Sequence, residues 1–418
     1  IDRLFFACVE GTHVACANLL HYLYKDQYVY VSKNNWYRYE KHRWVPTSEN
    51  LHLRIRITLL REFLKSKIHL LTKADDLKDM WFLIKSLGMT STKDQVMKAC
   101  HEKFGDEHFE SKLDSNADLI CFRNGVYDLS KGEFRNGQPS DYLSLCTNTD
   151  YVRLEENDER VLAIFEFLDQ LFPVVEVREY VLLLLSSFLE GRNPNERFHI
   201  WTGVGGNGKS KLLELFERTF GDYAGKIPIE ILTNLRKGNG ESASPQLVSC
   251  RGRRLISCSE PDKHVSFNSG LIKEWTGNDR ISARQLYGKA FTFTPQFKLL
   301  ALCNQLPEVD AHDEGFWRRA SVIEFKSRFV DEPKHSHEHK KDPNLNQKFM
   351  QWREAFMFIL LEYYQDYKRI GLKEPEAVKN ATSDYRSSVD NVQAFLDETI
   401  EYEQGSHLSL KEIWTQYK

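Results

Sequence analysis

The chain has 418 residues, 41% of them hydrophobic and 28% charged, a balance typical of water-soluble globular proteins with roughly two to four domains. Its net charge of −3 excludes a uniformly basic nucleic-acid-binding protein, so any nucleic-acid contact requires a local basic patch. No apolar run is long enough to span a membrane, and the eight cysteines form no C-x-x-C pair, which argues against a zinc site or a disulfide framework and favours a reducing, intracellular compartment.

Residues 1–155 carry no nucleotide-binding motif and are predicted to be a mainly helical region with small β elements. Apolar periodicity predicts a helix over 1–25 and further helices over 51–104. Alternating runs between them predict a three-stranded meander over 28–45. The Asn124-Gly125 pair predicts the turn of a β-hairpin within 118–135. Two helices, over 158–172 and 177–190, are then predicted to open the next domain, 156–330.

Residues 203–210 form a complete G-x-x-x-x-G-K-[ST] phosphate loop between an apolar run with strand character and an apolar-periodic helix. Glycines let the backbone turn its N–H groups toward a phosphate, and the start of the following helix adds a positive partial charge. Lys209 can reach the β- and γ-phosphates, and the Ser210 hydroxyl can ligate Mg²⁺. We therefore predict an ATP and Mg²⁺ site with these nucleotide-binding residues: Gly203, Val204, Gly205, Gly206, Asn207, Gly208, Lys209, Ser210 and Lys211.

Two later apolar strands end in polar residues that suit the same site. The run 254–260 ends in Glu260, which can hold the metal or orient the attacking water, and Asp262 is a weaker second acid. The run 297–304 ends in Asn304, which can hydrogen-bond the γ-phosphate or the attacking water. An asparagine that only forms a turn after the strand would give the same sequence pattern.

Two groups of basic residues lie in or just after this part of the sequence. Two alternating runs within 281–294 predict a β-hairpin whose tip region carries Arg284, Tyr287 and Lys289, in a segment (251–298) with nine Lys/Arg and four Asp/Glu. A solvated charged face is the alternative. Arg318 and Arg319 precede a strand over 321–325, and one of them can act on the γ-phosphate of a neighbouring subunit or simply pair with a nearby acid.

The remaining sequence, 331–418, is predicted to be a helical region, with a charged, His-rich loop over 331–343 and two or three helices from 344 onward. The chain begins with Ile1 and ends inside a predicted helix over 410–417, so we expect a piece of a longer protein.

Taken in this order, the motifs resemble those of superfamily 3 helicases, in particular the helicase half of primase–helicases from large DNA viruses (the poxvirus NTPase–primase family) and phage satellites. The resemblance rests on the phosphate loop, the strand before Glu260, the segment 275–284, the strand before Asn304 and the Trp317-Arg318-Arg319 run. Residues 121–129 resemble the family's upstream domain, and 375–396 its helical tail. Many members carry two adjacent acids where this chain has Ser259 before Glu260.

The resemblance implies an α/β fold of the AAA+ type, which forms a homo-hexameric ring with ATP and Mg²⁺ between subunits and single-stranded DNA in the channel. Lys209, Glu260, Asn304 and Arg318 or Arg319 would be its catalytic residues, with Ser210 and Glu260 near the metal. Arg284, Tyr287 and Lys289 would contact DNA. The expected place of action is inside the infected host cell, at the site of viral or phage genome replication. The expected partners are a primase domain, covalently linked or separate, and replication-fork proteins, with no membrane.

Two other classes of protein remain open at this stage. A phosphate-loop kinase acting on a small substrate predicts turnover without DNA and a monomer or dimer. An ATP-dependent loader or scaffold predicts nucleotide binding without steady hydrolysis. Neither explains the basic hairpin between the second and third motifs.

Overall fold

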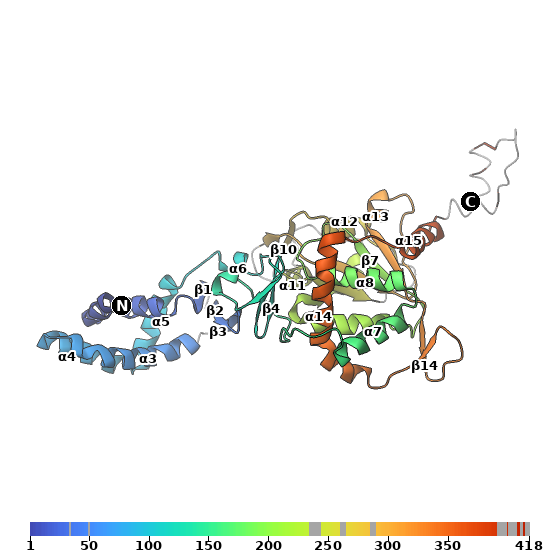
Figure 1. Ribbon diagram of the computed structural model, residues 1–418. Helices are drawn as coiled ribbons and strands as arrows, with labels where there is room; N and C mark the ends of the chain where they lie inside the picture. The colour runs from blue at the N-terminus through green and yellow to red at the C-terminus, as the bar shows by residue number, and fades with distance from the viewer. Residues whose placement is uncertain are drawn as a thin grey trace. The chain divides into compact units, whose positions relative to one another are not determined.

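The computed structural model describes residues 1–32, 35–48, 51–233, 244–259, 265–284 and 290–390, together with the single residues 399, 408, 409 and 413. The chain divides into two compact units, Ile1–Cys146 and Thr147–Lys418, whose helices and strands are labelled in Figure 1. Our boundaries at 155 and 330 stay predictions. Among the described helices, none is both long and apolar enough to cross a lipid bilayer.

The first unit combines helices with two small antiparallel sheets. Its sheets have the strand orders β1-β2-β3 and β4-β5-β6, which confirms the predicted meander and the predicted hairpin. The predicted helix over 1–25 is wrong in one respect, because it is interrupted at Gly11, whose φ of 71° ends the first helical segment. The elements are α1 (Asp2–Ala7), α2 (His13–Tyr24), β1 (Tyr28–Ser32), β2 (Asn35–Glu40), β3 (Arg43–Ser48), α3 (Leu51–Lys67), α4 (Ala74–Ser86), α5 (Thr90–Lys103), α6 (Phe109–Lys112), β4 (Leu119–Phe122), β5 (Gly125–Asp128) and β6 (Glu133–Arg135).

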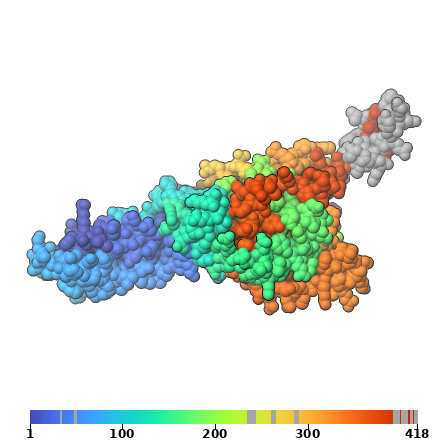
Figure 2. Space-filling model, in the orientation of Figure 1, coloured from blue at the N-terminus to red at the C-terminus, as the bar shows by residue number. Residues whose placement is uncertain are grey.

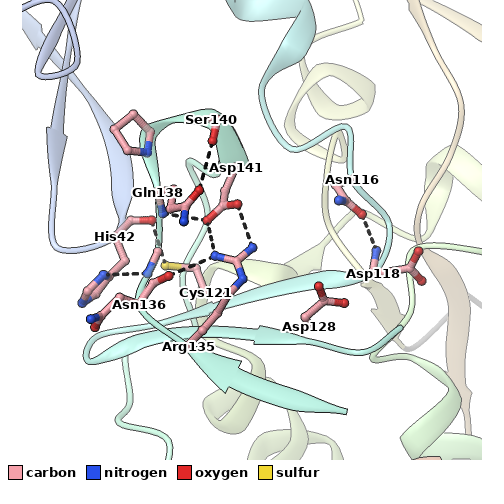
Figure 3. A network of polar contacts seen from close by, with 12 residues as sticks. His42, Asn116, Asp118, Cys121, Asp128, Arg135, Asn136, Gln138, Ser140 and Asp141 are labelled. Carbon is pink, nitrogen blue, oxygen red and sulfur yellow. Dashed lines mark hydrogen bonds and ion pairs between the residues drawn. The ribbon is translucent and has the colours of Figure 1, made fainter. Parts of the chain in front are cut away.

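A network of polar contacts fixes the turn that follows β6 (Figure 3). The Arg135 guanidinium donates two parallel hydrogen bonds of 2.8 Å to the Asp141 carboxylate, a geometry that suits a planar fork. The backbone N–H of Gln138 donates to the same carboxylate at 2.7 Å. The backbone N–H of Gly137 donates to His42 Nδ1 at 3.1 Å. The network therefore ties the β4–β6 sheet to the turn between β2 and β3.

The second unit is built on a five-stranded parallel sheet with the order β13-β7-β12-β9-β8. Its strands are β7 (Phe198–Thr202), β8 (Ala224–Lys226), β9 (Leu255–Ser259), β12 (Lys298–Cys303) and β13 (Ala320–Glu324). The central strands are buried along their length, which explains why they read as continuous apolar runs in the sequence. The short edge strand β8 has no such run, and the sequence analysis missed it.

Helices cover this sheet. In Figures 1 and 2 the long helix α14 (Leu345–Ile370) lies against the green segment that contains α7 (Glu159–Leu171) and α8 (Val175–Ser187). Helix α14 also packs on α9 (Lys209–Phe220), the helix after the phosphate loop. Helix α15 (Glu376–Ser388) packs on β13, where the Thr382 hydroxyl accepts a hydrogen bond from the Val322 N–H at 3.0 Å.

The remaining elements of the second unit are short. One of them corrects a prediction, because the loop expected over 331–343 contains a strand, β15, which pairs in parallel with β14. The predicted helix over 410–417 lies almost entirely outside the described residues. The short elements of the second unit are α10 (Glu230–Thr233), α11 (Pro245–Ser249), α12 (Ser269–Thr276), β10 (Ile281–Arg284), β11 (Ala290–Phe293), α13 (Glu314–Trp317), β14 (Arg328–Val330) and β15 (Glu338–Lys340).

Candidate nucleotide-binding site

The phosphate loop connects the carboxyl end of β7 to the first turn of α9. Gly203, Gly206 and Gly208 have φ values of 136°, 78° and 85°, which side-chain-bearing residues rarely adopt. At two of these positions there is also no space for a side chain. A Cβ on Gly208 would lie 2.2 Å from the Leu171 side chain, and a Cβ on Gly203 would lie 2.6 Å from the Phe325 carbonyl oxygen. The glycines are therefore required by the path of the loop.

Lys209 is the first residue of α9, and its side chain turns back over the loop. Its Nζ donates to the Gly203 carbonyl at 2.7 Å, to Asn304 Oδ1 at 3.0 Å and to Asn207 Oδ1 at 3.4 Å. The residue is only 5% exposed. These three acceptors are neutral oxygens, and together they fix the position of the ammonium over the loop. This is the arrangement expected of a lysine that binds the terminal phosphates of a nucleotide.

The loop amides fit a phosphate group. Among the residues that the structure describes, none accepts a hydrogen bond from the N–H groups of Val204, Gly205 or Gly206. Asn207 is 2% exposed, and its side-chain amide donates to the Phe325 carbonyl at 3.3 Å, which holds the loop in place. Ser210 is exposed at the second position of α9, and a serine hydroxyl there suits a phosphate-bound Mg²⁺. These donors fit ATP with Mg²⁺.

The ends of two neighbouring strands lie beside this loop. Strand β12 pairs with β7 on one side and with β9 on the other, with Leu302 opposite Ser259. Because parallel strands end on the same side of a sheet, Ser259 at the end of β9 lies beside the end of β12. Asn304, the residue after β12, contacts Lys209 there. Glu260 and Asp262 follow β9 and lie outside the described residues, so their roles stay predictions.

The described residues offer no ready-made metal cage. Among them there is no group of three His, Cys, Asp or Glu side chains that could hold a metal ion. A metal carried in by nucleotide phosphates needs only one or two protein oxygens, which is what Ser210 and the predicted Glu260 would supply.

The two candidate arginines lie in different environments. Arg319 is 7% exposed and donates to the Glu196 carboxylate at 2.5 Å and to the Gly315 carbonyl at 2.9 Å. The Arg318 side chain is 67% exposed, and its guanidinium lies 3.5 Å from Glu196. Both precede β13, whereas the phosphate loop follows the parallel strand β7. Five residues of strand span about 16 Å. Both arginines therefore lie at the amino ends of the parallel strands, and their own phosphate loop lies at the carboxyl ends.

The predicted hairpin is present as the antiparallel pair β10–β11, in which Ile281 lies opposite Phe293 and Arg284 lies opposite Ala290. Arg284 is exposed at the last pair of the ladder. Tyr287 and Lys289 lie outside the described residues, so the role of the tip stays a prediction. Arg251 lies 5.6 Å from the centre of the Phe291 ring. Phe291 pairs with Ala283, so this contact is on the other face of the ladder from Arg284.

The sequence analysis missed the segment that covers the phosphate loop. After β13 the chain passes over the loop, and the Phe329 N–H donates to the Gly206 carbonyl at 2.8 Å. The Phe329 ring would lie 3.2 Å from a Cβ on Gly208. No motif marks these residues in the sequence, since the contact joins segments more than 100 residues apart.

The parallel sheet, the glycine-rich loop after β7 and the lysine that contacts Asn304 define a phosphate-loop α/β domain of the AAA+ type. Residues 17–173 match the family model described as D5 N terminal like, and residues 201–319 match a family of unknown function, DUF5906. These two segments match the two families, and relatives of the chain are viral proteins named as candidate helicases and primases, which confirms the resemblance drawn from its motifs.

Relatives from several large DNA viruses support this assignment. The chain is 37% identical, over 95% of its length, to L207/L206 of Acanthamoeba polyphaga mimivirus, which is named as a candidate helicase. It is 32% identical over 77% of its length to 121R of Invertebrate iridescent virus 3, also named as a candidate helicase. It is 25% identical over 74% of its length to C962R of African swine fever virus, named as a candidate primase. The chain spans 44%, 36% and 34% of these proteins, less than half of each.

A solved structure shares the fold. The A-form apo structure of the C-terminal region of NrS-1 superposes with a TM-score of 0.51 at 12% identity and covers 91% of this chain and 77% of that one. At this level of identity the likeness shows the fold alone.

Proposed function

We propose that this chain is the ATP-driven helicase motor of a viral or phage replication protein, which hydrolyses ATP and moves along single-stranded DNA. The observation that carries the proposal is the 3.0 Å contact between Lys209 Nζ and Asn304 Oδ1. It joins the phosphate loop to the polar end of the neighbouring strand, where a γ-phosphate would lie. The identity to viral proteins that are named as helicases supports the choice of a motor.

Each described residue has a role that follows from its position. The amides of Val204, Gly205 and Gly206 would bind phosphate oxygens, and Lys209 would exchange its neutral acceptors for the β- and γ-phosphates. Asn304 would hydrogen-bond the γ-phosphate or the attacking water. Mg²⁺, when bound with ATP, would neutralise charge on the phosphates.

The positions of the arginines support a ring. Arg318 is exposed and lies at the amino ends of the strands, away from its own phosphate loop. It therefore suits contact with the γ-phosphate bound by a neighbouring subunit. Arg319 is buried against Glu196 and suits a structural role. A homo-hexamer with single-stranded DNA in its channel would place Arg284, Tyr287 and Lys289 on the DNA backbone, and a primase domain and replication-fork proteins are its expected partners.

The test combines mass measurement with ATPase assays. Purified protein is sized with and without ATP and Mg²⁺, and turnover is measured with and without a single-stranded oligonucleotide. Lys209→Ala should abolish turnover, because alanine cannot replace a charge-assisted phosphate contact. Arg218→Ala is the matched control. It removes a cation from the same helix, where Arg218 pairs with Glu214, and should leave turnover unchanged.

The other outcomes separate the rival classes. Turnover near wild type in Lys209→Ala would overturn the proposal. ATP binding and assembly without steady hydrolysis would favour the loader or scaffold. Rapid phosphate transfer to a small substrate by a monomer or dimer, with no response to DNA, would favour the kinase.

A further inference from the structure

A cavity of about 350 Å³ lies in the first unit, between the β1–β2 strands and the first turns of α3. Three basic side chains line it, Arg38, His52 and Arg56, together with one acid, Glu40. Glu40 forms an ion pair with Arg38, so the one carboxylate among the described lining residues already has a cationic partner. The described lining residues therefore carry a net positive charge.

Arg56 is held in this wall by aromatic residues. Its guanidinium lies 5.3 Å from the centre of the Tyr24 ring. The nearby Tyr28 hydroxyl raises the pKa of Arg56 above its ordinary value. Neither neighbour carries a negative charge. No carboxylate in the described part of the chain pairs with Arg56, so its charge is fixed in position and not neutralised.

The other arginines of α3 show that this arrangement is particular to Arg56. Arg54 forms an ion pair with Asp94 on α5, and Arg61 donates to the Ile84 carbonyl at 2.9 Å. Both join α3 to a neighbouring helix. Arg56 makes no such connection, and it faces the cavity with His52 one helical turn before it on the same side.

We propose that this cavity binds a backbone phosphate of single-stranded nucleic acid, with Arg56 as its main ligand and His52 and Arg38 beside it. A guanidinium can fork onto two phosphate oxygens, and the two tyrosines hold it in place before the ligand arrives. The site is a second nucleic-acid contact, separate from the hairpin of the ATPase unit. The choice of nucleic acid among phosphate-bearing ligands rests on the proposed function, whereas anion binding at Arg56 does not.

The experiment uses the whole chain without ATP, so that the motor does not contribute to the result. Binding of fluorescein-labelled (dT)20 is followed by anisotropy at several salt concentrations, and amide hydrogen exchange of peptides covering 51–67 is measured with and without the oligonucleotide. The variants are Arg56→Gln, Arg56→Lys and Lys65→Gln. Lys65 is the matched control, because it lies about two and a half turns further along α3, on the opposite side of the helix, and its removal changes the net charge equally.

Arg56→Gln should weaken (dT)20 binding by roughly 5- to 20-fold and lower the salt slope by about 0.7, the value for one phosphate on a single strand. Oligonucleotide should slow exchange over 51–67 in the wild type but not in Arg56→Gln. Arg56→Lys should recover part of the affinity, which a loss of packing alone would not allow. Lys65→Gln should behave as the wild type.

Unchanged affinity and salt slope in Arg56→Gln would overturn the proposal, as would an equal loss in Lys65→Gln. Protection of 51–67 by a phosphoserine peptide but not by (dT)20 would overturn it in favour of a protein ligand. Basal ATPase should be the same in Arg56→Gln and the wild type. If the motor proposal fails and no hydrolysis is seen, the protection of 51–67 by (dT)20 remains a complete test of this site.

Discussion

Arg318 and Arg319 are adjacent in the sequence, and the structure predicts opposite consequences for their removal. Arg319→Ala removes the cation buried against Glu196 and the donor to the Gly315 carbonyl. Breaking a fully buried pair costs about 3–5 kcal/mol. The Glu196 side chain is 37% exposed, so water screens part of this loss. We expect a loss of about 2–3 kcal/mol in the free energy of unfolding.

That loss should appear as a fall in melting temperature. In a folded unit of this size, each kcal/mol lowers Tm by about 2–4 °C, so Arg319→Ala should melt roughly 4–12 °C below the wild type. Arg318→Ala removes an exposed side chain whose ion pair is worth about 0–1 kcal/mol, and it should melt within about 4 °C of the wild type. Tryptophan fluorescence against temperature measures both.

The two substitutions should rank in the opposite order for ATP hydrolysis, with the larger loss in Arg318→Ala. If Arg318 acts on a neighbour's γ-phosphate, Arg318→Ala should cut turnover by about 10³–10⁵, as in other phosphoryl-transfer systems, while nucleotide binding stays nearly unchanged. Mixing Lys209→Ala subunits, which keep the arginine, with Arg318→Ala subunits, which keep the pocket, should restore part of the activity. The reasoning is refuted if Arg318→Ala retains turnover, or if Arg319→Ala keeps its melting temperature and loses turnover instead. Mixed oligomers that form without restoring activity would refute the action across subunits.

Three further predictions concern acids and buried cations. Glu260→Gln should keep ATP binding and stop hydrolysis, so that ATP-loaded protein accumulates in filter-binding assays, and a larger effect of Asp262→Asn would show that the other acid acts. Burial, with Arg197 and Lys298 nearby, lowers the pKa of His199 to about 3, so the unfolded chain binds the extra proton between pH 6.5 and 3. The free energy of unfolding should therefore fall by about 5 kcal/mol as the pH drops from 6.5 to 3, and His199→Phe should flatten that part of the Tm profile. An equal slope in both proteins would contradict the assignment. Lys298 donates to the carbonyls of Ser187, the last residue of α8, and of Glu190 beyond it. Lys298→Met leaves these buried carbonyls without that donor, so it should lower the free energy of unfolding by about 2–6 kcal/mol in denaturant titrations. Lys226→Met on the exposed edge strand should have little effect.

Much of the nucleotide site could be predicted because its signals are local. The phosphate loop, the buried strand before it and the strand before Asn304 are each marked by a few adjacent residues. The distinction between Arg318 and Arg319 could not be predicted in this way. It depends on Glu196, which lies more than 120 residues earlier and reaches Arg319 only because β7 and β13 are neighbours in the sheet.

The same limit applies to the fold. Continuous apolar runs identified the central strands, whereas β8 has three residues at the edge of the sheet and pairs with only one neighbour, so its composition need not be apolar. The pair β14–β15 was missed for a similar reason, since its charged and histidine residues are those of a solvated loop. The cavity beside Arg56 also depends on tertiary contacts, because two tyrosines from other elements set the direction of that side chain.

Strand β13 gives the second unit a direct mechanical link between two distant places. At its start lies exposed Arg318, and just past its end the Phe325 carbonyl and the Phe329 N–H hold Asn207 and Gly206 of the phosphate loop. A buried strand is stiff along its length, because each residue is fixed by ladder hydrogen bonds to its neighbour. If the chain binds nucleotide as proposed, a shift of the phosphate loop on nucleotide release would be transmitted along β13 to Arg318. In a closed ring, the five-residue strand β13 would couple the nucleotide state of one subunit's phosphate loop to the position of the arginine that faces the next subunit.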